Sequence, residues 1–236
     1  MQTVAVSTPV GRLVVERPAR AEVFERFGID YCCEGRIVLV EACARAGVST
    51  AEVLAALAAA DALPPDPTEC DARTLDTAAL IDRLVGVHHD FLWRELAPLG
   101  ALAHRVAAAH RAEHPELSRL ARAYDCFRED MEVHLRKEEE LLFPALRELA
   151  GGRALPSMFH GDLHVPLLAM EGDHGRSEQS LRFFRKVTGG YLPPEDACDA
   201  WRALLERLRR LERDLHRHVH LENEILHARA RELTRR

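Results

Sequence analysis

The sequence has few of the residues that favour β-strands. Aromatic residues make up only 6% of its 236 residues, and alternating runs of valine, isoleucine and threonine are almost absent. Alanine, leucine, arginine and glutamate are abundant instead, and 30% of the residues are charged. Because this composition favours helices, we expect an all-α protein.

Long apolar runs are also missing. No run approaches the roughly 20 residues of a membrane span, and residues 1–18 lack the basic and apolar regions of a signal peptide. The six cysteines suggest no disulfide framework in a chain of this size. The formal net charge of −6 argues against nucleic acid as a partner. We therefore expect a cytoplasmic protein with reduced thiols, bound to neither membrane nor nucleic acid.

Glycine and proline divide the chain into two parts. Residues 1–65 form a small helical unit, in which Gly28 and Gly47 each end a short helix. A proline-rich stretch then opens a linker, which we place at residues 66–75. From residue 76 to residue 236 the apolar spacing predicts four long amphipathic helices.

Two copies of a His-x-x-x-Glu motif lie on apolar helical stripes. The first is His134 with Glu138, and the second is His218 with Glu222. Residues four apart on a helix point the same way, and here the flanking positions of that face are apolar, so each pair lies on the buried side. Burying an ionised carboxylate without a partner costs more than one helix can offset. A metal ion is therefore the expected partner.

Two further histidines stand at matching distances from these motifs. His89 precedes His134 by 45 residues, and His174 precedes His218 by 44 residues. The midpoints fall at a His-Pro turn and beside a Pro-Pro turn. In an antiparallel helical hairpin, residues equidistant from the turn lie at the same height. Two such hairpins, packed as a four-helix bundle, would bring four histidines and two carboxylates into one layer of the core.

The remaining histidines do not share this spacing, and we expect them to be structural or solvated. Two lie in the predicted first turn: His110 and His114. His88 points about 100° away from His89 on a helix. Two flank His218 on faces that we expect to be solvated: His216 and His220. Four more have no partner at a helical spacing: His104, His160, His164 and His227.

Cys32 and Cys33 are adjacent, between Gly28 and Gly35 and just before a predicted helix. A thiol that binds metal or undergoes redox chemistry needs exposure and a lowered pKa, as at a helix N-terminus. A disulfide between neighbours would be strained and easily reduced. The alternative is a chance pair of small buried residues, and the spacing alone does not decide between the two.

The predicted layer of imidazoles and carboxylates suits iron, manganese or zinc. Two carboxylates placed between the hairpins can each bridge two metal ions and leave positions open for small ligands. Ferritin-like di-iron proteins use Glu-x-x-His, whereas this chain has the histidine first and a spacing that is one residue longer. This order is typical of a hemerythrin-like site.

With these motifs, the chain resembles the iron–sulfur cluster repair di-iron proteins, the RIC family, over nearly its whole length. Asp30-Tyr31-Cys32-Cys33 is similar to the motif of that family's small cysteine-pair domain. Residues from about 76 onward resemble its hemerythrin-like domain, most clearly at residues 134–144 and 218–223. Two positions depart from the family: Glu34 replaces a usual second glycine, and His227-Ala228 replaces a usual Phe-Pro.

The resemblance implies an all-α fold, with a small helical domain before a hemerythrin-like antiparallel four-helix bundle. It implies a centre of two non-haem iron ions, oxo-bridged, that serves to restore iron–sulfur clusters damaged by nitric oxide or hydrogen peroxide. The partners would be damaged iron–sulfur proteins. The metal ligands, carried over residue by residue with the two glutamates bridging, are His89, His134, Glu138, His174, His218 and Glu222.

In the leading hypothesis the bundle supplies iron, and Cys32 and Cys33 act as transfer or redox thiols. A second hypothesis is an enzyme that reduces nitric oxide at the di-iron centre. A third is dioxygen binding or sensing, with the iron holding nitric oxide or dioxygen as a small ligand. A metal-free bundle would require six buried polar groups to satisfy one another. The sequence leaves open whether the cysteine domain contacts its own bundle or a partner chain in a homodimer.

Overall fold

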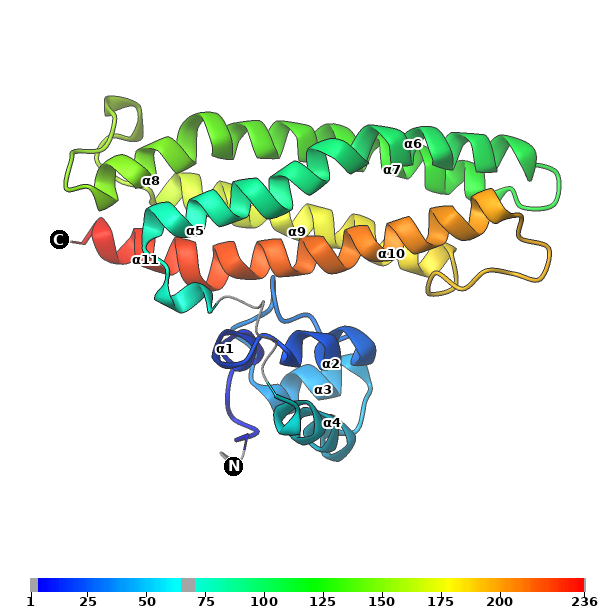
Figure 1. The fold of residues 1–236 in the computed structure, drawn as a ribbon, viewed down its shortest axis with the longest axis horizontal. Coiled ribbons are helices and arrows are strands. Elements are labelled where there is room, and N and C mark those ends of the chain that lie inside the picture. Colours follow the sequence, from blue (N-terminus) through cyan, green and yellow to red (C-terminus); the bar gives the residue numbers. More distant parts are fainter. Residues whose placement is uncertain (1–3, 65–70, 236) are drawn as a thin grey trace. The chain divides into compact units, whose positions relative to one another are not determined.

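The structure is a computed structural model that describes residues 4–64 and 71–235. Every regular element in these residues is a helix, apart from an isolated antiparallel bridge between Pro9 and Val38 (Figure 1). The all-α prediction is therefore confirmed. Cys70 and half of the predicted linker lie outside the described residues, and the predicted domain boundaries stay a prediction.

The chain divides into two compact units, and both boundaries fall inside helices. One unit is Met1–Leu80 with His216–Arg236, and the other is Ile81–Leu215. The last long helix crosses a boundary without a break, because α10 (Asp199–His220) continues directly into the π-helix η5 (Leu221–Leu226).

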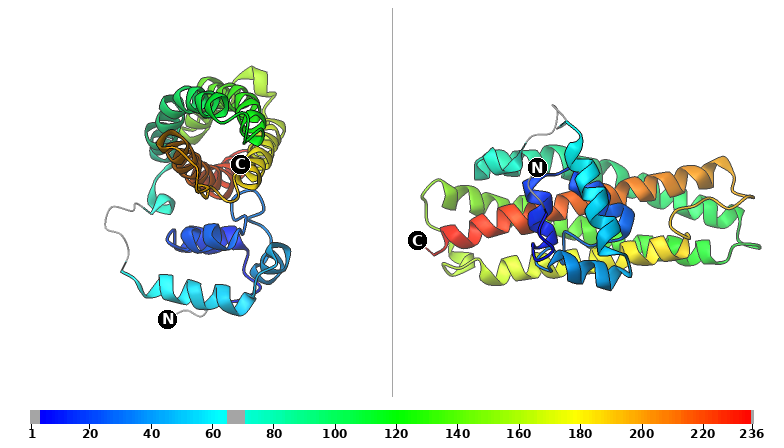
Figure 2. Two further views of the ribbon diagram at one scale, coloured as in Figure 1. Left: turned by 90° about the vertical axis from the view of Figure 1, so that its right-hand side faces the viewer. Right: turned by 90° about the horizontal axis from the view of Figure 1, so that it is seen from below.

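Four long helical stretches run through the unit of residues 81–215 and lie side by side (Figures 1 and 2). The first stretch consists of α5 (Thr77–Arg83), the π-helix η2 (Leu84–His89) and α6 (Asp90–Ala109). The second consists of α7 (Glu116–Lys137), the π-helix η3 (Glu138–Leu142) and α8 (Phe143–Ala150). The third is α9 (His164–Val187), and the fourth is α10. This confirms the predicted antiparallel four-helix bundle. Pro98 lies inside α6 without ending it.

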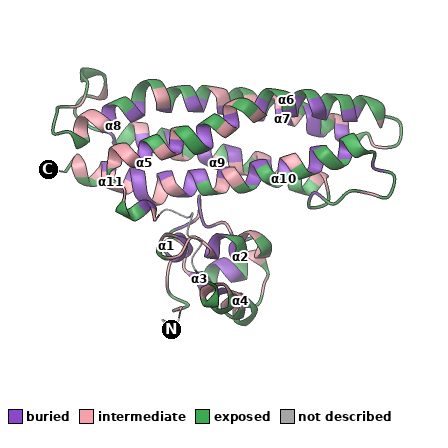
Figure 3. Ribbon diagram, viewed as in Figure 1, coloured by how far each residue is buried: buried purple, intermediate pink, exposed green. Residues whose placement is uncertain are grey.

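Apolar stripes at helical spacing form the core of this bundle, and the buried residues follow one side of each helix (Figure 3). At the turn end, Tyr124 and Phe127 of α7 pack on Phe184 of α9, with ring centroids 5.8 and 5.6 Å away. The Tyr124 hydroxyl donates a 3.0 Å hydrogen bond to the Leu96 carbonyl. This satisfies the polar atom of a fully buried ring.

The small helical unit contains α1 (Val10–Glu16), α2 (Arg20–Phe27), α3 (Leu39–Ala46) and α4 (Thr50–Ala62). Gly28 and Gly47 end α2 and α3 with φ of 66° and 69°, the left-handed region that glycine adopts at little cost. Ser49 caps α4 through the Glu52 amide. The sequence alone did not predict α1, whose seven residues are too few for a clear periodic pattern.

The end of the last helix belongs to the same compact unit as these short helices. The π-helix η5 is followed by α11 (His227–Leu233), and η5 contacts both α1 and the 3₁₀ turn η1 (Ala72–Thr74). Arg229 donates hydrogen bonds to carbonyl groups around this turn, the shortest of them 2.6 Å to Leu75. Asn223 donates a 3.0 Å hydrogen bond to the Cys32 carbonyl.

Among the described residues, no single helix has the length and apolarity to cross a bilayer. The consecutive helices α3 and α4 are long and apolar enough only when taken together, and the chain bends by 117° between them.

Candidate metal centre

Three of the six predicted ligand side chains lie in π-helical stretches. His89 is the last residue of η2, Glu138 is the first residue of η3, and Glu222 is the second residue of η5. A π-helical turn holds an extra residue and is frequently found at functional sites. In η2, Leu84 is fully buried while Val85, four residues before His89, is only half-buried. The α-helical spacing of the sequence gave no signal for these turns.

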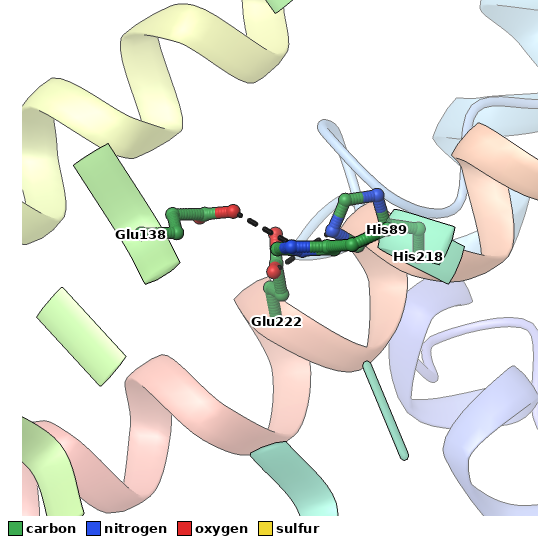
Figure 4. A group of neighbouring side chains, drawn as sticks. All are labelled: His89, Glu138, His218 and Glu222. Atoms are coloured by element: carbon green, nitrogen blue, oxygen red, sulfur yellow. Dashed lines mark hydrogen bonds and ion pairs between the residues drawn. The ribbon is translucent and has the colours of Figure 1, made fainter. Parts of the chain in front are cut away.

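The structure brings the six predicted side chains together in two overlapping groups. Within each group, one nitrogen or oxygen atom from every residue lies within 4.8 Å of the others. The first group, drawn in Figure 4, is His89, Glu138, His218 and Glu222. The second group is His134, Glu138, His174 and Glu222. The two glutamates therefore belong to both groups, as two bridging carboxylates would.

All six side chains are withdrawn from solvent. None is more than 2% exposed, and both glutamates are 0% exposed. The His89 and His134 Nε2 atoms lie 3.5 and 3.3 Å from Glu138 Oε2. Yet neither oxygen of Glu138 accepts a hydrogen bond from a described residue. Since an ionised carboxylate at full burial is costly without compensation, this residue set fits a bound cation.

Two carboxylates outside the groups, those of Glu139 and Asp173, lie on the Nδ1 side of the His89 and His134 rings. Glu139 Oε1 lies 2.9 Å from His89 Nδ1 and accepts a 2.8 Å hydrogen bond from Trp93 Nε1. Asp173 Oδ2 lies 3.5 Å from His134 Nδ1. Such partners fix the orientation of the ring and increase the basicity of its other nitrogen. In both rings that other nitrogen, Nε2, faces Glu138.

The pKa of Asp173 is held well below its usual range. The interaction with His134 is the largest cause, and Lys137 Nζ, which donates a 3.2 Å hydrogen bond to Asp173 Oδ2, adds to it against the opposing effect of burial. Asp173 is therefore ionised across the neutral pH range. A charged carboxylate behind the ring suits a histidine that offers Nε2 to a cation.

Most of the other histidines lie where the spacing placed them, outside the two groups. His88 is buried but pairs with Asp214, at 3.0 Å from Nδ1 to Oδ1. His110 and His114 lie at the end of α6 and in the following turn, far along the bundle from His89. His227, the position that departs from the family, is fully buried without belonging to either group.

The prediction that His220 is solvated was wrong. Its side chain is 4% exposed, and its ring meets the edge of the Tyr31 ring at a centroid distance of 5.4 Å. Burial lowers the pKa of His220 to about 4, against a raising effect from the Tyr31 backbone. His216 is half-buried on the same aromatic ring. The spacing along one helix contains no information about Tyr31, which is distant in sequence and covers this face.

The cysteine pair forms a third group of ligand atoms. Atoms of Asp30, Cys32 and Cys33 lie within 4.8 Å of one another, and both cysteines are in the thiol form. Cys33 is half-buried, whereas Cys32 is only 3% exposed. Asp30 Oδ1 accepts backbone hydrogen bonds from Cys32, Cys33 and Glu34, at 3.1, 2.8 and 3.3 Å. The pair is therefore held in an ordered loop.

Comparison with known families and proteins agrees with this geometry. Residues 79–230 match the family described as hemerythrin HHE cation binding domain, and residues 6–61 match ScdA_N, described as a domain of unknown function (DUF542). The chain is 33% identical over 218 residues to the iron-sulfur cluster repair protein ScdA of Staphylococcus haemolyticus, covering 92% of this chain and 95% of that protein.

Two further relatives are the iron-sulfur cluster repair proteins YtfE of Citrobacter koseri and of Escherichia coli O81. Each is 30% identical over 223 residues, covering 94% of this chain and 96% of the relative. The cation-binding domain thus contains two buried His/Glu groups consistent with a di-metal site. The resemblance inferred from the motifs is confirmed, and the chain belongs to the family of proteins with an ScdA_N domain and a hemerythrin HHE cation-binding domain that includes ScdA and YtfE.

Proposed function

We propose that this protein holds a non-haem di-iron centre and repairs iron–sulfur clusters damaged by nitrosative or oxidative stress, by supplying iron. The observation that carries the proposal is the sharing of two buried carboxylates, Glu138 and Glu222, by two groups of histidines. The names of the relatives support the repair function. The clients would be iron–sulfur proteins whose clusters have lost iron.

The group membership suggests a division of the ligands. His89 and His218 would hold one ion, His134 and His174 would hold the other, and the two glutamates would bridge. Nitrogen and oxygen donors of this kind suit iron, manganese or zinc, and the choice of iron rests on the relatives. Two bound iron ions would be able to change oxidation state and to bind small ligands such as nitric oxide or dioxygen.

The chain's own residues orient the ligands and exclude water. Glu139 and Asp173 hold the rings of His89 and His134 from the Nδ1 side. The Phe143 ring stacks on His89 at 5.4 Å and 30°. An apolar neighbour of this kind limits access of solvent to the nitrogen donors. Release of iron for repair therefore requires the bundle to open locally or a small ligand to compete for the ions.

The cysteine pair is the proposed point of transfer. Cys32 and Cys33 lie in the same compact unit as Glu222, and Asn223, the next residue after Glu222, donates a hydrogen bond to the Cys32 carbonyl. A movement of Glu222 would therefore be transmitted through Asn223 to the backbone of the cysteine loop. This contact supports a role for the pair in receiving iron or in docking a client.

The experiment that tests the proposal combines metal analysis with a repair assay. We expect about two iron ions per chain, because the two groups share their carboxylates. A [4Fe–4S] enzyme damaged by nitric oxide should recover its activity when the iron-loaded protein is added. The E138A/E222A variant should lose the iron held by the two His/Glu groups and, with it, the repair. His104→Asn, at an exposed histidine of α6 that pairs with Asp125, is the control and should lose neither. A purified protein that binds no iron, or that fails to restore the cluster, would refute the proposal.

A further inference from the structure

We propose that Asp30, Cys32 and Cys33 form a separate mononuclear site for one divalent cation of borderline softness, such as Fe²⁺ or Zn²⁺. The inference deepens the proposed function, on which its physiological meaning rests, because the site would be the place where iron leaves the protein. It concerns a different part of the chain from the two His/Glu groups. Its donors are two sulfurs and one oxygen instead of nitrogens and oxygens.

Two of the three distances between the donor atoms are close to what a tetrahedral cation requires, and the third, from Cys33 to Asp30, is within 4.8 Å. Metal–sulfur bonds of about 2.3 Å place two thiolates about 3.8 Å apart, and with a metal–oxygen bond of about 2.1 Å the sulfur–oxygen edge is about 3.6 Å. The observed distance between the two Sγ atoms is 4.0 Å, and Cys32 Sγ lies 3.4 Å from Asp30 Oδ1. Both distances are thus within about 0.2 Å of the tetrahedral values.

The loop is built to hold the carboxylate in this place. Three consecutive backbone N–H groups donate to Asp30 Oδ1, so the side chain cannot rotate away without losing them. The Cys32 thiol also donates to this oxygen at 3.4 Å. Metal binding would replace that shared proton, since two thiols release two protons when one divalent cation binds as a dithiolate.

The surrounding contacts fix the loop against the last helix. Asn223 Nδ2 donates to the Cys32 carbonyl at 3.0 Å. A Cβ added at Gly35 would lie 2.8 Å from the Tyr31 carbonyl oxygen and 2.6 Å from Glu224 Oε1, so only glycine fits where the loop leaves the pair. Rigid support of this kind is what a metal site needs in order to keep its donors in place.

The number of donors favours an exchanging site over a structural one. Structural zinc sites are closed by four protein ligands, whereas three ligands leave a position for an external group. Here the open position would accept a ligand from a client, such as a thiolate of a damaged cluster. Cys33 is half-buried and Cys32 is buried, so the entry to the site lies on the Cys33 side.

The test is a titration of the full chain, reduced and stripped of metal, with Co²⁺, which absorbs strongly in the near ultraviolet when bound to thiolate. In the E138A/E222A background, which removes the shared carboxylates of the bundle, one equivalent of Co²⁺ should still give the thiolate absorption. Adding C32S and C33S should abolish it. Adding C126S and C198S instead, at two exposed cysteines, should leave it unchanged. Failure to see the absorption while the pair is intact and reduced would overturn the site.

A second variant does not depend on the fold of the bundle mutant. Asp30→Asn keeps an oxygen that can accept the three backbone hydrogen bonds but removes the charge, so the helix content should be unchanged. We expect its Zn²⁺ affinity at the pair to fall by about tenfold or more, measured by competition with a chelator. An unchanged affinity would contradict the proposal.

The same variants separate this inference from the proposed function. In the otherwise unchanged chain, Co²⁺ binding should fall from three equivalents to two when C32S and C33S are introduced. If the cobalt–thiolate absorption appears but the chain does not repair clusters, the proposed cysteine site is supported and iron donation is rejected. If the chain repairs clusters but gives no cobalt–thiolate absorption, iron donation is supported and the proposed cysteine site is rejected.

Discussion

Asn223 joins the helix of the candidate metal centre to the cysteine loop, because its side-chain amide donates a 3.0 Å hydrogen bond to the Cys32 carbonyl oxygen. Its neighbour Glu222 belongs to both His/Glu groups. The contact gives the small helical unit a direct mechanical link to a proposed bridging ligand. It is also open to a simple mutational test.

Replacing Asn223 with alanine or aspartate removes this donor. We expect the free energy of unfolding to fall by about 1 kcal/mol, the net value of one hydrogen bond, and Cys33 to react faster with a thiol reagent because its loop is less restrained. Iron content should be unchanged, since Asn223 is in neither His/Glu group. Equal labelling rates in the wild type and both variants would show that the contact does not restrain the loop.

Glu138→Gln should have opposite effects on the metal-free and the metal-loaded protein. The glutamine is close in size but neutral, so in the metal-free chain it removes a carboxylate that is fully buried without a hydrogen bond. We expect the metal-free variant to gain about 1–3 kcal/mol in free energy of unfolding. The metal-loaded variant should lose iron, because a bridging charge is gone.

Chemical denaturation with and without iron measures both effects. Glu140→Gln, two residues along at an exposed position, is the matched control and should change neither stability. Destabilisation of the metal-free form by E138Q would mean that the carboxylate is well compensated without a cation.

Glu139→Gln tests the outer carboxylate behind His89. The substitution weakens the acceptor that lies 2.9 Å from His89 Nδ1 and 2.8 Å from Trp93 Nε1. We expect metal affinity to fall by about 10- to 100-fold, with a change in Trp93 fluorescence and little change in fold by circular dichroism. The prediction fails if chelator competition gives the affinity of the wild type.

His114 provides a pH-dependent contact at the turn end of the bundle. Its pKa is raised above 6.5, first by Asp196, whose Oδ2 lies 2.9 Å from Nε2, and then by Glu116. Because the folded pKa is raised, the stabilisation is fully present below pH 6.5 and is lost as the pH rises through the folded pKa. An NMR titration of the ring should show the raised value, and Asp196→Asn should lower it. Glu195→Gln, at the adjacent carboxylate, should have a smaller effect.

Gly35→Ala should destabilise the cysteine loop. Its new Cβ would lie 2.8 Å from the Tyr31 carbonyl oxygen, a backbone atom that cannot move cheaply. We expect a loss of about 1–3 kcal/mol in the free energy of unfolding, as for other overpacked sites. Gly172→Ala, inside α9 with only the tip of Arg176 nearby at 3.9 Å, should instead stabilise by about 0.5–1 kcal/mol. Thermal unfolding of the two variants shows whether the steric contact at Gly35 is the cause, since a general effect of replacing glycine would change both stabilities in the same direction.

The features that were predictable from the sequence are those that local periodicity controls. The His134–Glu138 and His218–Glu222 spacings place each pair on one helix face, and the nearly equal distances back to His89 and His174 follow from two folded hairpins of similar length. The ends of α2 and α3 were predictable because Gly28 and Gly47 adopt the left-handed conformation that few other residues tolerate. These features depend on chain geometry within a single helix or hairpin.

Other features depend on residues that are distant in the sequence. His220 is buried because Tyr31 covers it, and the Cys32 carbonyl is bound by a side chain 191 residues away. The π-helical turns at His89, Glu138 and Glu222 likewise have no signal in an α-helical period.

The amino-acid sequence by itself therefore determined the long helices, the two hairpins and the six side chains that share one layer, since hydrophobic spacing and turn residues act locally. Only the tertiary structure decided that Tyr31 covers His220 and that Asn223 binds the Cys32 carbonyl. The reason is that distances between side chains on different elements are set by the packing of those elements, which no local pattern encodes.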